Sequence, residues 1–438
     1  MTQVLGAELP TEWRAARLKD CISFLNRGTA PDYVDDGPVR AISQAANQSG
    51  GLDWSRTRFH SHSGDPAKLR GYLLAGDILV NSTGTGTLGR IGYFQRSPDN
   101  RACMADGHVT ITRTRRDVLW PRFGYYWLAS TPFQDLIFAA LSLGATNQIE
   151  LSRERFSEAP VPLPPIEEQR RIADFLDSEV ARIDALVARS ERQIVALAEH
   201  LQEVMRVATT CDSPTDVKAT GIAWMPYVSA DWSLHRISRI FAVGSGTTPP
   251  SERLEYYRNG DQYWVTSTDV RDAVISDTRS KVTHRATVEI PSLVVHPAGS
   301  LVIAMYGAGA TKGRVGLLEM AAAVNQACCV LSNPGEVLPR FAFYWFRAHK
   351  AGIIQLASGA GQPNLSAELI KSLVIPAPPP RRQESIVRRL ELEQSATERA
   401  TSLLRERVTL LRERRQALIA AAVTGQIDVT TARGGGFS

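Results

Sequence analysis

Three glycines in the first half of the chain have the spacing of a dinucleotide-binding loop. Gly84, Gly86 and Gly89 follow a strand-like apolar segment in the pattern G-x-G-x-x-G. In a nucleotide site the third glycine opens a helix whose N-terminus meets the pyrophosphate. Here residues 90–94 (RIGYF) continue as a predicted strand instead. The pattern therefore favours a glycine-rich loop between two strands, and we expect no bound nucleotide there.

Other patterns for catalysis or metal binding are weak. His60 and His62 form a local pair, but neither a nearby cysteine nor paired carboxylates complete a zinc-binding set. The sequence contains neither G-x-S-x-G nor the phosphate-binding pattern G-x-x-x-x-G-K-[ST]. Residues 333–336 (NPGE) begin like the Asn-Pro-Pro-aromatic motif of amino-methyltransferases, but the aromatic residue that would hold a flipped base is missing. We therefore predict no catalytic residues and no directly bound metal or cofactor.

Charge and cysteine usage narrow the class of protein. The 438 residues have a formal net charge of +5 and a pI near 9.0, and arginine is the main cation. This balance suits contacts with phosphates and guanine edges, although many soluble proteins are as basic. The five cysteines contain no C-x-x-C pair and predict a reducing compartment without a disulfide framework. With no export signal and no apolar run of about 18 residues, we expect a cytoplasmic protein outside the membrane.

The elements that would position functional residues occur twice in the chain. Gln169 recurs as Gln383 and Leu176 as Leu390, each 214 positions later. Upstream the displacement drifts, as loop insertions would cause, but further landmarks keep their order: Trp13 and Trp232, Arg90 and Arg314, Phe123 and Phe341. An internal repeat of this length predicts two copies of one domain.

Each copy has two compositionally different parts. The first part is rich in glycine, threonine, valine and aromatic residues with short alternating runs, which predicts a β-rich domain. The second has neither glycine nor proline for more than forty residues, which predicts one long helix. Apolar residues in the first helix recur in steps of four and three from Leu176 to Ala208, interrupted only by Ser190; the second helix has Arg415 within its weaker ladder.

The two helices carry opposite charge imbalances. Acidic residues outnumber basic ones in the first helix, and basic residues prevail in the second. This favours pairing of the helices with each other, and two amphipathic helices with unrelated partners are the alternative. We predict an α+β fold of two β-rich domains, each followed by a long helix, with the helices paired as an antiparallel coiled coil of pseudo-twofold symmetry. The predicted boundaries are 1–164 for the first β-rich domain, 165–210 for the first helix, 211–222 for a linker, 223–379 for the second β-rich domain, 380–425 for the second helix and 426–438 for a tail.

Two segments carry a family resemblance. Residues 166–177 (IEEQRRIADFLD), after a proline-rich run, and residues 410–428 (LLRERRQALIAAAVTGQID) resemble the specificity subunit of type I restriction-modification systems, HsdS. The resemblance extends over the whole chain. It implies that the β-rich domains are target recognition domains, each reading one half of a bipartite, asymmetric DNA site, and that the helices form the spacer between them.

The resemblance also implies the partners. They are double-stranded DNA, two modification (methyltransferase) subunits and, in complexes that include them, two restriction (motor-nuclease) subunits. S-adenosylmethionine, ATP and Mg would be used by those subunits, so this chain would be a non-catalytic specificity subunit. The copies differ where residues 380–382 (PRR) replace 166–168 (IEE), which predicts unequal docking of the two partners in detail. Alternatives are the specificity subunit of a related methyltransferase or phage-defence complex, and a helical scaffold that does not bind DNA.

Candidate DNA contacts have to be chosen from chemistry, because recognition domains of this family vary most. We select side chains that can donate to phosphates or base edges from segments rich in glycine, serine or threonine. In the first domain the candidates are Arg27, Thr29, Ser43, Gln44, Arg56, Arg58, Thr85, Arg90 and Gln148. In the second domain they are Thr247, Thr248, Ser267, Thr268, Arg271, Lys281, Arg285, Lys312, Arg314 and Gln362.

Overall fold

The computed structural model of the chain describes residues 3–48, 51–84, 86–143, 149–211, 215–307, 311–357 and 364–429. The chain divides into two compact units. The first consists of Met1–Ser190 together with Glu406–Ser438, and the second of Glu191–Arg405. Each unit therefore combines one β-rich domain with parts of both long helices.

The first unit contains two four-stranded sheets. One is antiparallel in the order β11-β10-β13-β4, and all four residues of its central strand β10 are buried. The other has the order β12-β6-β9-β5, with β12 and β6 parallel. The strands are β4 (Ile22–Arg27), β5 (Tyr33–Val34), β6 (Val39–Ile42), β9 (Arg58–His60), β10 (Ile78–Asn81), β11 (Ile91–Tyr93), β12 (Ala102–Ala105) and β13 (Val109–Thr114).

The second unit repeats this topology. Its larger sheet has the order β22-β25-β24-β27-β20, so that β25-β24-β27-β20 correspond to β11-β10-β13-β4, with β22 added at the edge. Its smaller sheet has the order β23-β21-β26, with β21 and β26 parallel. The strands are β20 (Ala242–Ser245), β21 (Gln262–Val265), β22 (Ala273–Ile275), β23 (Ser280–Val282), β24 (Leu301–Ala304), β25 (Val315–Leu318), β26 (Ala322–Val324) and β27 (Cys328–Ser332).

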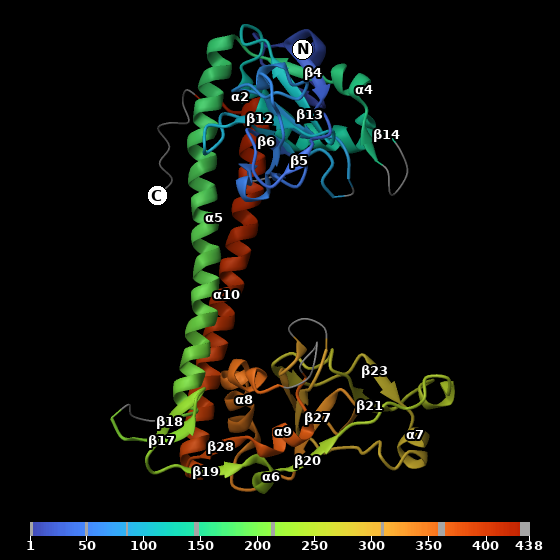
Figure 1. Cartoon of the computed structure of the whole chain (residues 1–438), viewed down its shortest axis with the longest axis vertical. Helices are drawn as coiled ribbons and strands as arrows, with labels where there is room; N and C mark the ends of the chain where they lie inside the picture. Colours follow the sequence, from blue (N-terminus) through green and yellow to red (C-terminus); the bar gives the residue numbers. More distant parts are fainter. Residues whose placement is uncertain are drawn as a thin grey trace. The chain divides into compact units, whose positions relative to one another are not determined.

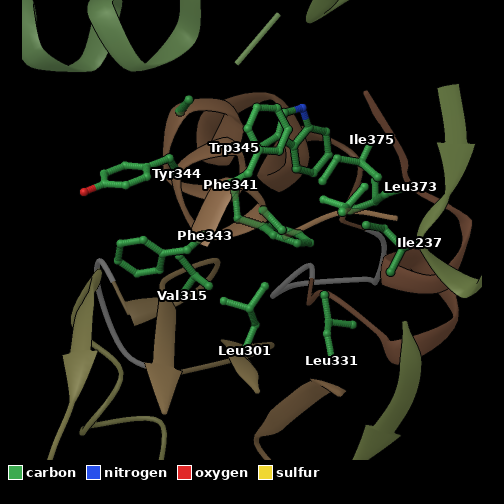
Figure 2. Packing of buried hydrophobic residues seen from close by; sticks show 14 of the residues in the cluster. Ile237, Leu301, Val315, Leu331, Phe341, Phe343, Tyr344, Trp345, Leu373 and Ile375 are labelled. Carbon is green, nitrogen blue, oxygen red and sulfur yellow. The ribbon is translucent and has the colours of Figure 1, made fainter. Parts of the chain in front are cut away.

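A helix covers the larger sheet of each unit and carries most of its aromatic core. These helices are α2 (Pro121–Ala129) and α8 (Pro339–Gln355), and each begins with the proline that suits the first helical position. In the second unit Phe341 of α8 faces Leu301 and Leu331 of the sheet (Figure 2), and Trp345 is buried in the same core. The burial of these large side chains stabilises the unit.

The long helices α5 (Ile166–Ala208) and α10 (Pro380–Val423) run antiparallel. In the first unit, Leu176 near the start of α5 shares a core with Ile419 near the end of α10. In the second unit, Leu201 near the end of α5 shares a core with Leu390 near the start of α10. Within each unit the two helices lie side by side, α5 in green and α10 in red (Figure 1).

The two irregular positions in the apolar ladders have local explanations. Ser190 is buried, and its hydroxyl donates to the carbonyl oxygen of Leu186 at 3.0 Å, so it satisfies its hydrogen bond inside its own helix. Arg415 pairs with α5 itself, because its Nε lies 3.1 Å from Oδ1 of Asp184. The charged position that weakens the second ladder thus contributes an ion pair between the helices.

A buried glutamine fastens the first turn of each long helix to the loop before α2 or α8. Gln169 accepts from the amide of Trp120 at 2.7 Å and donates to the carbonyls of Val118 at 3.0 Å and Pro164 at 2.9 Å. Gln383 accepts from the amide of Leu338 at 2.7 Å and donates to two carbonyls, each at 2.8 Å: those of Glu336 and Pro378. The same three bonds therefore occur in both repeats.

The segment predicted as a linker is partly strand. Within residues 211–222, strand β17 (Val217–Ile222) pairs with β18 (Met225–Ser229). Lys218 Nζ donates to the carbonyl oxygens of Ala230 and Trp232. In the predicted tail, Val429 is buried in the core of the first unit. Parts of the predicted linker and of the predicted tail therefore belong to the folded units.

Candidate nucleic-acid interface

In each unit a glycine directly follows the edge strand of the larger sheet. At this glycine the backbone passes in close contact with a strand of the smaller sheet. A Cβ on Gly28 would lie 1.9 Å from the carbonyl oxygen of Ala105, and a Cβ on Gly246 would lie 2.2 Å from that of Val324. Only glycine tolerates such an approach. The amide of the next residue donates to the same carbonyl, from Thr29 at 3.2 Å and from Thr247 at 2.9 Å. Both repeats therefore place a threonine at the same end of their sheets.

Six of the residues predicted for the first domain gather at that end. Strands β4 and β10 both run antiparallel to β13, so their C-terminal ends lie together. The amide of Asp106 donates to the carbonyl of Ile42 at 3.0 Å, which brings the ends of β12 and β6 to the same place. We call this the first strand-end surface, formed by Arg27, Thr29, Ser43, Gln44, Arg58 and Arg90.

Two of these residues brace the glycine-rich loop from within. Arg90 donates to Oε1 of Gln48 at 2.8 Å and to the carbonyl of Gly86 at 3.0 Å. Gln44 accepts from the hydroxyls of Thr83 at 3.4 Å and Thr87 at 3.3 Å. Their side chains therefore hold the loop in shape.

The arginines of this region have different environments. Arg27 pairs with Glu150 at 3.1 Å. Arg56, at the end of the short helix η1 (Trp54–Arg56), pairs at 2.9 Å with Asp53, the N-cap residue of that helix. Arg58 is exposed, and its guanidinium carbon lies 3.7 Å from the centroid of the Tyr33 ring. Stacking engages the face of a guanidinium and leaves its N–H edges available to acceptors. Arg58 is thus oriented without being neutralised.

The second unit has an equivalent surface at the same end of its sheets. Arg271 Nε donates to the carbonyl of Thr268 at 3.2 Å, in the loop between β21 and β22. Arg314 directly precedes β25, and its carbonyl accepts from the amide of Ala304 at the C-terminal end of β24. We call this the second strand-end surface, formed by Thr247, Thr248, Ser267, Thr268, Arg271, Lys312 and Arg314.

Two predicted residues of the second domain lie elsewhere. Lys281 is in β23 opposite Tyr263, with Nζ 4.5 Å from the ring centroid. Arg285 lies in α7 (His284–Glu289), where it pairs with Glu289 at 2.6 Å. Because β23 runs antiparallel to β21, α7 follows at the opposite end of the sheet from Ser267. Thr85, Gln148 and Gln362 lie outside the described residues.

The structure adds residues that sequence reasoning missed. Gln48 holds Arg90, and Nδ1 of His108 lies 2.8 Å from the hydroxyl of Thr83. Both come from strand ends that are distant in sequence from the loop, and only the sheet register brings them there.

The other chemically suggestive groups have structural environments. His60 Nδ1 accepts from the amide of Asp32 at 2.9 Å. Among the residues described, no group of three histidine, cysteine or acidic side chains is arranged to hold a metal ion. Burial raises the pKa of the Cys103 and Cys328 thiols to about 12. None of the described helices combines the length and apolar character needed to span a membrane.

Comparison with known proteins identifies the family. The model of the type I restriction modification DNA specificity domain matches residues 10–194 and 229–400, one match in each repeat. The chain belongs to this family. It is 22% identical over 435 residues to the putative type I restriction enzyme MjaX specificity subunit of Methanocaldococcus jannaschii, covering 97% of this chain and 96% of that protein. It is also 22% identical over 421 residues to the type I restriction enzyme EcoBI specificity subunit of Escherichia coli, covering 88% and 85%.

Solved structures share the fold of the family. A chain from work on complex assembly and conformational transition of the type I R-M system aligns with a TM-score of 0.70 and 17% identity, covering 96% of this chain and 100% of that chain. The HsdS subunit from Thermoanaerobacter tengcongensis aligns with a TM-score of 0.53 and 16% identity, covering 96% and 98%. The predicted α+β fold, with two β-rich domains each followed by a long helix, is confirmed.

Proposed function

We propose that this chain is the DNA-reading specificity subunit of a type I restriction-modification complex and that each repeat reads one half of a bipartite, asymmetric site. The observation that carries the proposal is the repeated strand-end surface. In both units the glycine after the edge strand is followed by a threonine, which lies at the same end of the sheets as a glycine-rich segment and a set of basic side chains. Such a surface combines close backbone approach with donors for phosphates and base edges.

Within the first strand-end surface the residues have separate roles. The exposed guanidinium of Arg58, held on Tyr33, suits a guanine edge or a phosphate. Arg27 would exchange its partner Glu150 for a phosphate. Arg90 and Gln44 keep the loop in one conformation before DNA arrives, which lowers the ordering cost of binding. The proposed DNA contacts are the residues selected from the sequence except Arg285, which lies at the opposite end of the second smaller sheet.

Partner subunits supply the chemistry in this proposal. Two modification subunits would dock on the long helices and use S-adenosylmethionine, and restriction subunits would use ATP and Mg. The chain itself contributes DNA recognition and assembly. This division of labour agrees with a family defined by DNA specificity.

Mapping of methylated adenines in genomic DNA tests whether each repeat reads one half of the DNA site. Cells would express the chain with the modification subunits encoded beside it, and methylated sites would be read by long-read sequencing. Arg58→Ala should relax one half of the site, and Arg314→Ala the other, because the two residues lie in different repeats. The loss of one base contact costs about 1–3 kcal/mol, or roughly a fivefold to 150-fold loss of discrimination at that position.

Arg285→Ala is the matched control, since it removes the same charge from the far end of the second sheet. It should leave the methylated motif unchanged. A motif that stays intact in both test variants, or that loses both halves in either one, would overturn the assignment of one half-site to each repeat.

A further inference from the structure

A groove in the second unit lies between the edge of the larger sheet and the first turns of α10. Its volume is about 840 Å³. Apolar walls come from Leu317 of β25, Pro339 of α8 and Val387 of α10, and its rim carries Glu319 and Glu384. Gly299, which lines the groove, has φ +85°, and a Cβ there would meet no atom within 4 Å.

At the corresponding place in the first unit, an exposed arginine of the chain itself lies against the matching glycine. Gly76 matches Gly299, and a Cβ there would meet the guanidinium of Arg116 at 3.2 Å and Pro121 at 3.4 Å. The Arg116 guanidinium donates to the carbonyl of Ala75 at 2.6 Å. In the first unit the corner beside Ala75 and Gly76 thus holds the guanidinium of Arg116.

The second repeat lacks that arginine. Arg116 lies two residues before Val118, whose carbonyl bonds Gln169, and Pro334 lies two residues before Glu336, whose carbonyl bonds Gln383. Proline at this position leaves the corner open. A second replacement puts a smaller side chain beside the groove. In the first unit the guanidinium of Arg122 lies over the ring of Tyr93, and in the second unit Leu317 stands in the place of that tyrosine.

The charges around the groove favour a cationic occupant. Arg340 and Glu391 neutralise each other in an ion pair of 2.8 Å. Of the remaining charged lining residues, Glu319 and Glu384 are exposed acids and Arg388 is an exposed base. A net negative rim above apolar walls matches a side chain with an aliphatic stem and a cationic head.

We propose that this groove is a docking site for an arginine side chain presented by a partner polypeptide, in the place that Arg116 fills in the first unit. The aliphatic stem lies against Leu317 and Val387. The guanidinium reaches the carbonyl of Ala298, the counterpart of Ala75, and the carboxylates of the rim. This proposal concerns a protein-binding surface and does not rest on DNA reading by either repeat.

Methyl resonances of the full-length chain provide a direct test. Leu317, Val274 and Val387 line the groove and report its occupation when leucine and valine methyls are labelled. We expect N-acetyl-arginine methylamide to shift these resonances with half-saturation on the order of millimolar, since a fragment of this size binds weakly. N-acetyl-citrulline methylamide, of the same shape without charge, should bind at least about tenfold more weakly.

Two variants separate the groove from general effects. Pro334→Arg combined with Leu317→Tyr copies the first repeat and should abolish the shifts of Val274 and Val387. Glu384→Gln should weaken binding severalfold, whereas Glu252→Gln removes an exposed charge elsewhere in the unit and should not. The core methyls of Val302 and Leu331 report that the variants are folded. Equal shifts with the citrulline compound, or no groove shifts at 50-fold the expected half-saturation, would overturn the proposal.

Discussion

Replacing the buried glutamine at the start of each long helix by alanine should destabilise the unit that contains it. Gln169 is 1% exposed and Gln383 is fully buried, and each makes three hydrogen bonds to the backbone of its own unit. Alanine keeps the helix but removes all three bonds. It also leaves the amide of Trp120 or Leu338 without its acceptor.

The magnitude follows from the number of bonds. A neutral hydrogen bond contributes about 1 kcal/mol net, and a buried donor left without a partner costs a further 1–3 kcal/mol or so. We therefore expect each variant to lower the free energy of unfolding of its unit by about 4–6 kcal/mol. Because the bond lengths are nearly the same in the two repeats, the two losses should agree within about 1 kcal/mol.

Scanning calorimetry of the full-length chain measures both units in one experiment. Gln169→Ala should lower the transition of the first unit and Gln383→Ala that of the second. Gln193→Ala, at an exposed position on α5, is the control and should change stability by less than about 0.5 kcal/mol. A loss below 1 kcal/mol in either buried variant would refute the reasoning, as would a loss in the control equal to theirs.

Three further results are expected. A thiol reagent should label Cys211 first, since the other cysteines are buried and burial raises the pKa of their thiols to about 11 or 12, which lowers the thiolate fraction. Burial lowers the pKa of His349 to about 3, so the stability from its neutral form is present above pH 6.5 and is lost as the pH falls towards 3. Urea unfolding should show the second unit losing about 2 kcal/mol between pH 7 and 5, a loss absent in His349→Phe. Gly28→Ala should cost on the order of 3 kcal/mol in urea unfolding, whereas Gly107→Ala, where the nearest atom to a Cβ is 3.9 Å away, should be tolerated.

The sequence predicted the repeated architecture because the repeat is carried by local patterns. The alternating runs and the long glycine-free segments each specify an element, and matching landmarks such as Trp13 and Trp232 specify that the elements occur twice. Arg415 shows that the apolar pattern of a single helix does not predict contacts made with the other helix. It weakens the apolar ladder of α10 and yet pairs with Asp184 of α5.

The candidate site was less accessible to sequence reasoning, because it depends on the register of strands distant in the chain. Gln48 and His108 support the glycine-rich loop from other strand ends, and no local pattern connects them with it. Arg285 was selected for its charge, but the direction of β23 carries it to the opposite end of the sheet. Arg90 was selected as a DNA donor, and its hydrogen bonds to Gln48 and Gly86 give it a supporting role.

The division of the first unit between both ends of the chain has a consequence for biosynthesis. Its core includes Ile419, Ala422 and Val423, which leave the ribosome more than two hundred residues after Val180, a residue of the same core. At about 5–20 residues per second, the nascent first domain waits for tens of seconds with the apolar face of α5 uncovered. Translation that stalls before residue 406 leaves this face exposed. Such products are expected to be substrates for chaperones and proteases, so that only completed chains accumulate.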